Sequence, residues 1–151
     1  MVGENIDKHP EVYQHVVQAG HRVGNHTYNH IKGWHCSTAT YLANVQKCAD
    51  SLTTTAQKPN LLFRPPYGKA TWCQRRMLHR MGYRIIYWDI LTKDYDASVT
   101  PEMMLDKIKR QVQPGSIINF HDSVKSNERM LAVLPQAIEW LLAQGYRCEP
   151  L

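Results

Sequence analysis

Strand-like and helix-like segments alternate along this chain, and their alternation limits its possible folds more than any other feature. Short β-rich runs are followed by segments with apolar residues at helical spacing, without a repeat, a linker or a change of composition. This order is typical of parallel sheets in α/β proteins, either open or closed into a barrel. Because 151 residues suffice for one hydrophobic core, we expect a single domain over residues 1–151.

Capping residues, glycines and prolines set the expected boundaries. Helices are predicted to begin near Pro10, Ser37 or Thr38, Thr71 and Pro101, and a last helix to end at Gly145 with Pro135 in its first turn. Strands are predicted within residues 2–6, 21–25, 61–63, 83–90, 116–120 and 146–149, with a break at residues 58–60. The apolar run at residues 83–90 indicates a strand that is covered on both faces.

Composition excludes several classes of protein. No apolar run approaches the roughly 20 residues of a membrane span, and the first residues lack a signal-peptide pattern. The net charge is +5, but the basic residues are dispersed and Arg75-Arg76 is their longest run, so we expect no nucleic-acid partner. Four scattered cysteines indicate no disulfide framework. The compartment stays open: cell envelope or secretion if a signal precedes Met1, and cytoplasm otherwise.

Chemically suggestive residues follow the predicted strands, where parallel strands bring their carboxyl ends to one edge. His26 and His30 are four residues apart, so on one side of a helical turn their rings can converge on a divalent metal. Alternatively, these two residues form a small structural zinc site with His35 and Cys36, although no second ligand pair at finger-like spacing follows. The prolines in the Arg-Pro-Pro-Tyr-Gly segment at residues 64–68 predict a rigid loop.

In order, these motifs resemble the polysaccharide deacetylase family with the NodB homology domain, carbohydrate esterase family 4. Residues 26–30 match its His-[Ser/Thr]-x-x-His motif, and residues 64–68 match Arg-x-Pro-[Tyr/Phe]-Gly in full. The segments from Trp88 to Asp94-Tyr95 and from Ile117 to His121-Asp122 are similar to its fourth and fifth motifs. The resemblance implies a deformed (β/α) barrel that removes N- or O-acetyl groups from an acetylated glycan. It also implies a divalent metal, zinc first, with cobalt or nickel as alternatives.

The resemblance further implies a role for each matching residue. His26 and His30 would bind the metal, the backbone N–H of Tyr67 would stabilise the oxyanion, and His121 would be the general acid. Asp94 would assist His121, with an Asx-turn as the alternative role for Asp94, whereas Asp122 is predicted to be a loop or cap residue. Arg64 completes the catalytic set. The expected substrate contacts are Tyr95, Pro66, Trp88 and Asn119, of which Tyr95 and Asn119 depart from the residues usual in the family.

The family's first motif, an Asp-Asp-Gly-Pro segment on the first barrel strand, would supply the catalytic base and a third metal ligand. The 151 residues contain no Asp-Asp pair, so we expect the motif to belong before Met1 and this chain to be an impaired enzyme. Without that strand, residues 2–6 would form an exposed edge strand through which the chain could self-associate. Two alternatives stay open: a non-catalytic relative that binds glycan, and an amidohydrolase of the same fold that acts on a small amide.

Overall fold

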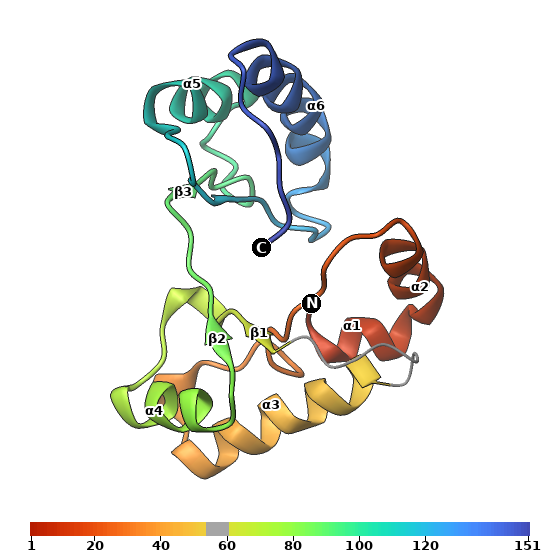
Figure 1. Ribbon diagram of the computed structural model, residues 1–151, viewed down its shortest axis with the longest axis vertical. Helices are drawn as coiled ribbons and strands as arrows, with labels where there is room; N and C mark the ends of the chain where they lie inside the picture. The colour runs from red at the N-terminus through yellow and green to blue at the C-terminus, as the bar shows by residue number, and fades with distance from the viewer. Residues whose placement is uncertain (54–60) are drawn as a thin grey trace. The chain divides into compact units, whose positions relative to one another are not determined.

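The computed structural model describes residues 1–53 and 61–151, which form two compact units (Figure 1). The N-terminal unit comprises residues 1–87 and 150–151, and the C-terminal unit comprises residues 88–149. The break predicted at residues 58–60 lies outside the described residues. Each unit contains a pair of short parallel strands with helices packed on it. The predicted α/β class is therefore confirmed.

The N-terminal unit is organised around Phe63. β1 (Leu62–Phe63) pairs in parallel with β2 (Arg84–Ile85), and Asn25 forms a parallel bridge to Phe63. Phe63 is fully buried among side chains from the neighbouring helices. The helices of this unit are α1 (Gly3–Lys8), α2 (Pro10–Gln18), η1 (Gly33–His35), α3 (Thr38–Thr53), η2 (Pro66–Gly68) and α4 (Trp72–Arg80).

The caps predicted for α3 and α4 are confirmed. The Oγ of Ser37 accepts a hydrogen bond from the backbone N–H of Thr40, 3.1 Å away, at the start of α3. Thr71 and Gln74 form a reciprocal capping box at the start of α4, in which each side chain accepts from the other's backbone N–H. Gly82 follows α4 with a φ of 85°, as a glycine after a helix end commonly does.

The C-terminal unit repeats this arrangement with fewer elements. β3 (Ile90–Leu91) pairs in parallel with β4 (Ile118–Asn119). α5 (Pro101–Gln111), capped by Thr100 as predicted, lies beside α6 (Asn127–Ala143) (Figure 1). The hydrophobic core cluster of this unit comes from β3 and both helices: Ile90, Met104, Ile108, Val133 and Ala137.

The strand predicted at residues 2–6 is wrong, because this segment is helix α1. Gly3 explains the packing of α1: a Cβ at this position would lie 3.0 Å from the Cα of Cys48 in α3. The backbone N–H groups of Gly3 and Glu4 donate to the carbonyls of Thr27 and Tyr28 at 3.0 and 2.8 Å, which satisfies the first turn of the helix. The exposed edge strand predicted to mediate self-association is therefore absent from the described residues.

Three further boundaries differ from the prediction. The run at residues 83–90 contributes to both strand pairs, as β2 and β3, and its exposed residues Arg84, Tyr87 and Asp89 show that it is not covered on both faces. Pro135 is the ninth residue of α6 instead of lying in its first turn. Residues 146–149 form no strand. In the described part of the chain, no helix has both the length and the apolar character to cross a membrane.

Candidate functional site

The histidine pair lies in an irregular turn that follows Asn25. Thr27 and His30 have positive φ angles of 62° and 56°, so the predicted helical turn is wrong. The turn is held by buried Asn25, whose Nδ2 donates to the carbonyl of Val45 at 2.8 Å and whose Oδ1 accepts from the N–H of Thr27 at 2.9 Å. The rings of His26 and His30 nevertheless meet, with centroids 4.9 Å apart. The backbone thus brings the pair together by left-handed residues, not by helical periodicity.

His26 is held in one tautomer by the neighbouring motif. Its Nδ1 lies 2.6 Å from the carbonyl oxygen of Arg64. A carbonyl can only accept, so Nδ1 carries the proton and the lone pair lies on Nε2. Burial lowers the pKa of His26 to about 3, although the hydrogen bond to Arg64 acts in the opposite direction. The ring is therefore neutral near pH 7, which is the form that binds metals.

The histidine pair fits part of a metal-ligand set. Catalytic zinc sites usually have three protein ligands and one open position, and His26 and His30 supply two of them. Within residues 1–53 and 61–151, no cluster of three or more His, Cys, Asp or Glu side chains could hold a metal. The alternative structural zinc site with His35 and Cys36 is therefore not formed by these residues. His35 lies instead beside Trp34, with ring centroids 5.7 Å apart.

The two prolines of the loop at residues 64–68 restrict its backbone angles. It forms the short helix η2, within which Tyr67 adopts a left-handed φ of 57° and Pro66 is buried. The ring of Tyr67 packs edge-on against the rings of His30 and Trp34, at centroid distances of 4.6 and 5.5 Å. Within the described residues, the backbone N–H of Tyr67 donates to no acceptor. The loop therefore presents an uncommitted donor beside the histidine pair.

Arg64 connects this loop to the strand pair. Its backbone N–H donates to the carbonyl of Asn25 at 3.0 Å, and its guanidinium contacts the carbonyls of Ile86 and Tyr87 at 3.4 and 3.3 Å. Burial lowers the pKa of Arg64. These contacts fix the position of the loop relative to β2, which the sequence could not reveal, because they depend on backbone carbonyls.

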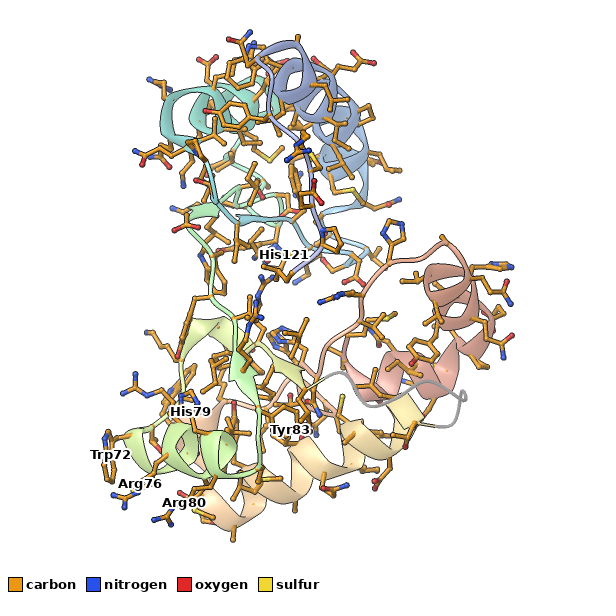
Figure 2. All side chains as sticks on the ribbon, viewed as in Figure 1. Trp72, Arg76, His79, Arg80, Tyr83 and His121 are labelled. Carbon is orange, nitrogen blue, oxygen red and sulfur yellow. The ribbon has the colours of Figure 1, made fainter. Side chains whose placement is uncertain are left out.

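A second group of candidate residues lies within the C-terminal unit, around His121, which is labelled in Figure 2. Asp94 is fully buried, and its carboxylate accepts from the backbone N–H of His121 at 2.6 Å and from its Nδ1 at 2.7 Å. The ring of Tyr95 meets the imidazole edge-on at 4.9 Å, and Nδ2 of Asn119 lies 3.5 Å from Nε2. Three predicted site residues therefore surround His121.

Two residues that sequence analysis missed support this group. The buried Oγ of Ser126 donates to the carbonyl of His121 at 2.7 Å, and Nε of Arg129 donates to the carbonyl of Asp94 at 2.8 Å. No motif marks either residue. The carboxylate of Asp94 accepts from His121, and the Asx-turn in this loop is formed instead by Asp96. The Oδ1 of Asp96 accepts from the backbone N–H of Ser98 at 3.0 Å.

The structure thus brings the predicted residues together in two groups. His26, His30, Arg64, Pro66 and Tyr67 belong to the N-terminal unit. Asp94, Tyr95, Asn119 and His121 belong to the C-terminal unit, which begins at Trp88. Trp88 is partly buried, and Asp122 is exposed, in keeping with its prediction as a loop residue.

Comparisons with known proteins identify similar sequences and structures among deacetylases. A profile of the family named polysaccharide deacetylase matches residues 1–86. The peptidoglycan-N-acetylglucosamine deacetylase of Bacillus cereus is 26% identical over 148 residues, covering 97% of this chain and 69% of that protein. Chitin deacetylase 2 of Saccharomyces cerevisiae is 28% identical over 130 residues, covering 82% of this chain and 42% of that protein. This chain therefore spans less than half the length of the yeast relative.

The solved structures include a peptidoglycan N-acetylglucosamine deacetylase, Bc1960, in complex with 4-naphthalen-1-yl-N-oxidanyl-benzamide. It matches with a TM-score of 0.94 at 26% sequence identity, covering 99% of this chain and 70% of that one. The fold described above is thus shared with a deacetylase along almost the whole chain.

Proposed function

Because the chain belongs to the polysaccharide deacetylase family, we propose that it hydrolyses acetyl groups on a glycan that contains N-acetylglucosamine. The observation that carries this proposal is the hydrogen bond from Nδ1 of His26 to the carbonyl of Arg64, since it joins the two most specific motifs. That bond holds His26 in the tautomer whose Nε2 can bind a metal, while burial keeps the ring neutral. The substrate class rests on the named activities of the relatives from Bacillus cereus and Saccharomyces cerevisiae. The deformed (β/α) barrel of the NodB type, as one domain, is part of the same proposal.

His26 and His30 are the residues that would hold a divalent metal, zinc first, with cobalt or nickel as alternatives. When bound, such a metal polarises the acetyl carbonyl and acidifies a water molecule. The backbone N–H of Tyr67 donates to the oxyanion that develops on the acetyl oxygen, and its rigid loop avoids reorganisation during the reaction. Arg64 positions both the loop and His26 through its backbone and guanidinium contacts.

His121 protonates the leaving amine from Nε2, while its Nδ1–H stays directed at Asp94. The buried carboxylate orients the imidazole through this hydrogen bond. Tyr95 and Asn119 flank the same ring, so they restrict its rotation and line the approach of the leaving group. Trp88 and Pro66 stay proposed as substrate contacts.

The step that the 151 residues do not supply is deprotonation of the attacking water. None of the candidate residues grouped with His26 and His30 carries a carboxylate, and the sequence has no Asp-Asp pair. We therefore propose that the 151-residue polypeptide is a slow enzyme. General-base catalysis typically contributes about 10²–10⁴-fold, which sets the expected deficit.

Acetate release from fully N-acetylated chitotetraose, with added zinc or cobalt, tests this function. The 151-residue chain should release acetate slowly, and the same chain extended by an Asp-Asp-Gly-Pro-bearing strand should be faster by about 10²–10⁴-fold. In the extended chain His121→Ala should remove most of the gain, whereas His35→Ala, which replaces an exposed histidine, should keep it. Ordinary enzyme rates in the short chain that His121→Ala leaves unchanged would contradict the assigned roles.

A non-catalytic glycan-binding role is the second candidate, and the incomplete metal-ligand set favours it. The same experiment separates the two functions. An extended chain that binds chitotetraose but releases no acetate with either metal would establish the binding role.

A further inference from the structure

A pocket of about 320 Å³ lies beside the loop at residues 64–68, the motif loop, in the N-terminal unit. This volume is within the range of pockets that bind small ligands. Gly68 of the motif loop forms part of its wall, and Trp34 and Tyr87 contribute exposed aromatic rings. Aromatic faces of this kind can stack on the apolar face of a sugar ring.

A chain of ring contacts connects this pocket to the histidine pair. Trp34 contacts Tyr67 at a centroid distance of 5.5 Å, and Tyr67 contacts His30 at 4.6 Å. His30 in turn contacts His26 at 4.9 Å. Trp34, which lines the pocket, is therefore linked to His30 through the single side chain of Tyr67, and an adjacent sugar of a bound glycan could lie against this wall.

The charged residues that line the pocket are basic. Lys69 and Arg75 line it, both exposed, and no acidic residue is among its lining residues. Lys69 lies over the ring of Trp34, with Nζ 5.6 Å from the centroid. Neither cation takes part in an ion pair with a carboxylate of the described residues. Two unpaired cations around aromatic walls are suited to a sugar that carries an anionic group.

We propose that this pocket is a subsite for a carboxylate-bearing sugar, adjacent to the sugar whose acetyl group is removed. Trp34 and Tyr87 contact the ring of this sugar, while Lys69 and Arg75 bind its carboxylate. The inference deepens the proposed function, on which the adjacency rests, by assigning the substrate to the acidic glycans. The recognition of the carboxylate itself rests only on the pocket.

Binding to the 151-residue chain tests the subsite without requiring turnover. The probes are a tetrasaccharide of alternating N-acetylglucosamine and N-acetylmuramic acid, and the same tetrasaccharide with its carboxylates converted to primary amides. The indole N–H signal of Trp34, assigned with Trp34→Phe, reports binding in NMR titrations. The carboxylate form should bind about fivefold or more tightly than the amide form at low salt, and 0.5 M salt should remove most of this preference.

Two substitutions and a matched control locate the preference. Arg75→Gln and Lys69→Gln should each reduce it to about twofold or less. Arg76→Gln is the control, because Arg76 follows Arg75 on α4 but contacts Trp72, with Cζ 5.1 Å from the ring centroid. Figure 2 shows Arg76 and Trp72 pointing outward from α4. The Arg76→Gln chain should therefore keep the full preference.

Equal binding of the two tetrasaccharides, or no binding of either at millimolar concentration, would overturn the subsite. An Arg76→Gln chain that loses as much preference as Arg75→Gln would also overturn it. Failure of the proposed function is a different result: carboxylate-selective binding by a chain that, even when extended, releases no acetate. Conversely, an extended chain that deacetylates both tetrasaccharides equally well refutes only the subsite.

Discussion

The carboxylate of Asp94 binds His121 at two points, through the backbone N–H at 2.6 Å and through Nδ1 at 2.7 Å. One bond fixes the backbone and the other fixes the ring, so the imidazole cannot rotate without losing its buried partner. Nε2 is the ring nitrogen that Asp94 does not contact. This geometry agrees with the role of general acid that we propose for His121, with Asp94 as its orienting carboxylate.

Asp94→Asn should therefore impair the reaction strongly. The amide of Asn offers an N–H towards Nδ1, where the ring must itself donate, and the charged imidazolium loses its anionic partner. We expect kcat of the extended chain to fall by about 10²–10⁴-fold with little change in KM. Asp122→Asn is the matched control, since Asp122 is exposed and adjacent to His121, and it should leave kcat unchanged. Equal losses in the two variants would contradict the role of Asp94.

Zinc should bind weakly to the 151-residue chain and depend on both motif histidines. His26→Ala and His30→Ala should each abolish the heat of zinc binding in calorimetry, because one imidazole alone is a poor site. His35→Ala should leave the titration unchanged. A loss of zinc binding in His35→Ala would instead support the structural zinc site with Cys36, and tight binding that survives both motif substitutions would exclude the proposed pair.

Gln74→Ala should destabilise the N-terminal unit by about 2–3 kcal/mol. The fully buried Gln74 accepts from the backbone N–H of Thr71 at 2.9 Å and donates to the carbonyl of Gly33 at 2.7 Å, so its loss leaves both groups without a partner. Gln46→Ala removes an exposed glutamine that contacts Asp50 and should change the free energy of unfolding by less than about 0.5 kcal/mol. Urea denaturation curves of the two variants test this difference.

The four cysteines should react with iodoacetamide at very different rates. Cys73 and Cys148 are exposed, whereas Cys48 is fully buried, and burial raises the pKa of its thiol. Because the thiolate is the nucleophile, Cys48 should be alkylated about 10²-fold or more slowly than Cys73 until the chain unfolds. Peptide mass spectrometry measures the order, and early labelling of Cys48 would show that the contact between α1 and α3 opens readily.

The same thiol should make stability depend on alkaline pH. The pKa of Cys48 is raised in the folded chain above its ordinary value of 9.0, so the unfolded chain releases this proton first. The free energy of unfolding should therefore be unaffected below about pH 8 and fall as the pH rises past 9. In Cys48→Ala this part of the alkaline loss should disappear, which pH-dependent urea curves can detect.

The sequence predicted well those elements whose ends carry their own chemistry. The caps Ser37, Thr71 and Thr100 satisfy helix N–H groups locally, so α3, α4 and α5 could be located without tertiary information. Residues 2–6 could not be predicted in this way. Val2 and Ile6 suggested a strand, but the segment is helix α1, and Gly3 lets it approach Cys48, a residue distant in sequence.

The candidate site shows the same limit. Family motifs identified His26, His30 and His121, but the helical turn expected for the pair is replaced by left-handed residues, a feature without a local signal at Thr27. Ser126 and Arg129 were missed because they act through the carbonyls of His121 and Asp94, and any polar residue at the right place could do so. Sequence therefore identifies side chains with a chemical role more readily than those that hold them.

Within residues 1–53 and 61–151, four residues other than glycine have left-handed backbone angles: Thr27, His30, Tyr67 and Lys93. Each lies in a candidate motif or directly before Asp94, and each costs about 1 kcal/mol relative to glycine. Among family members that have lost the chemistry, mutation is free to relieve this cost by drifting to glycine or asparagine. We therefore expect the residue types at these four positions to differ between family members under selection for catalysis and members that have lost it.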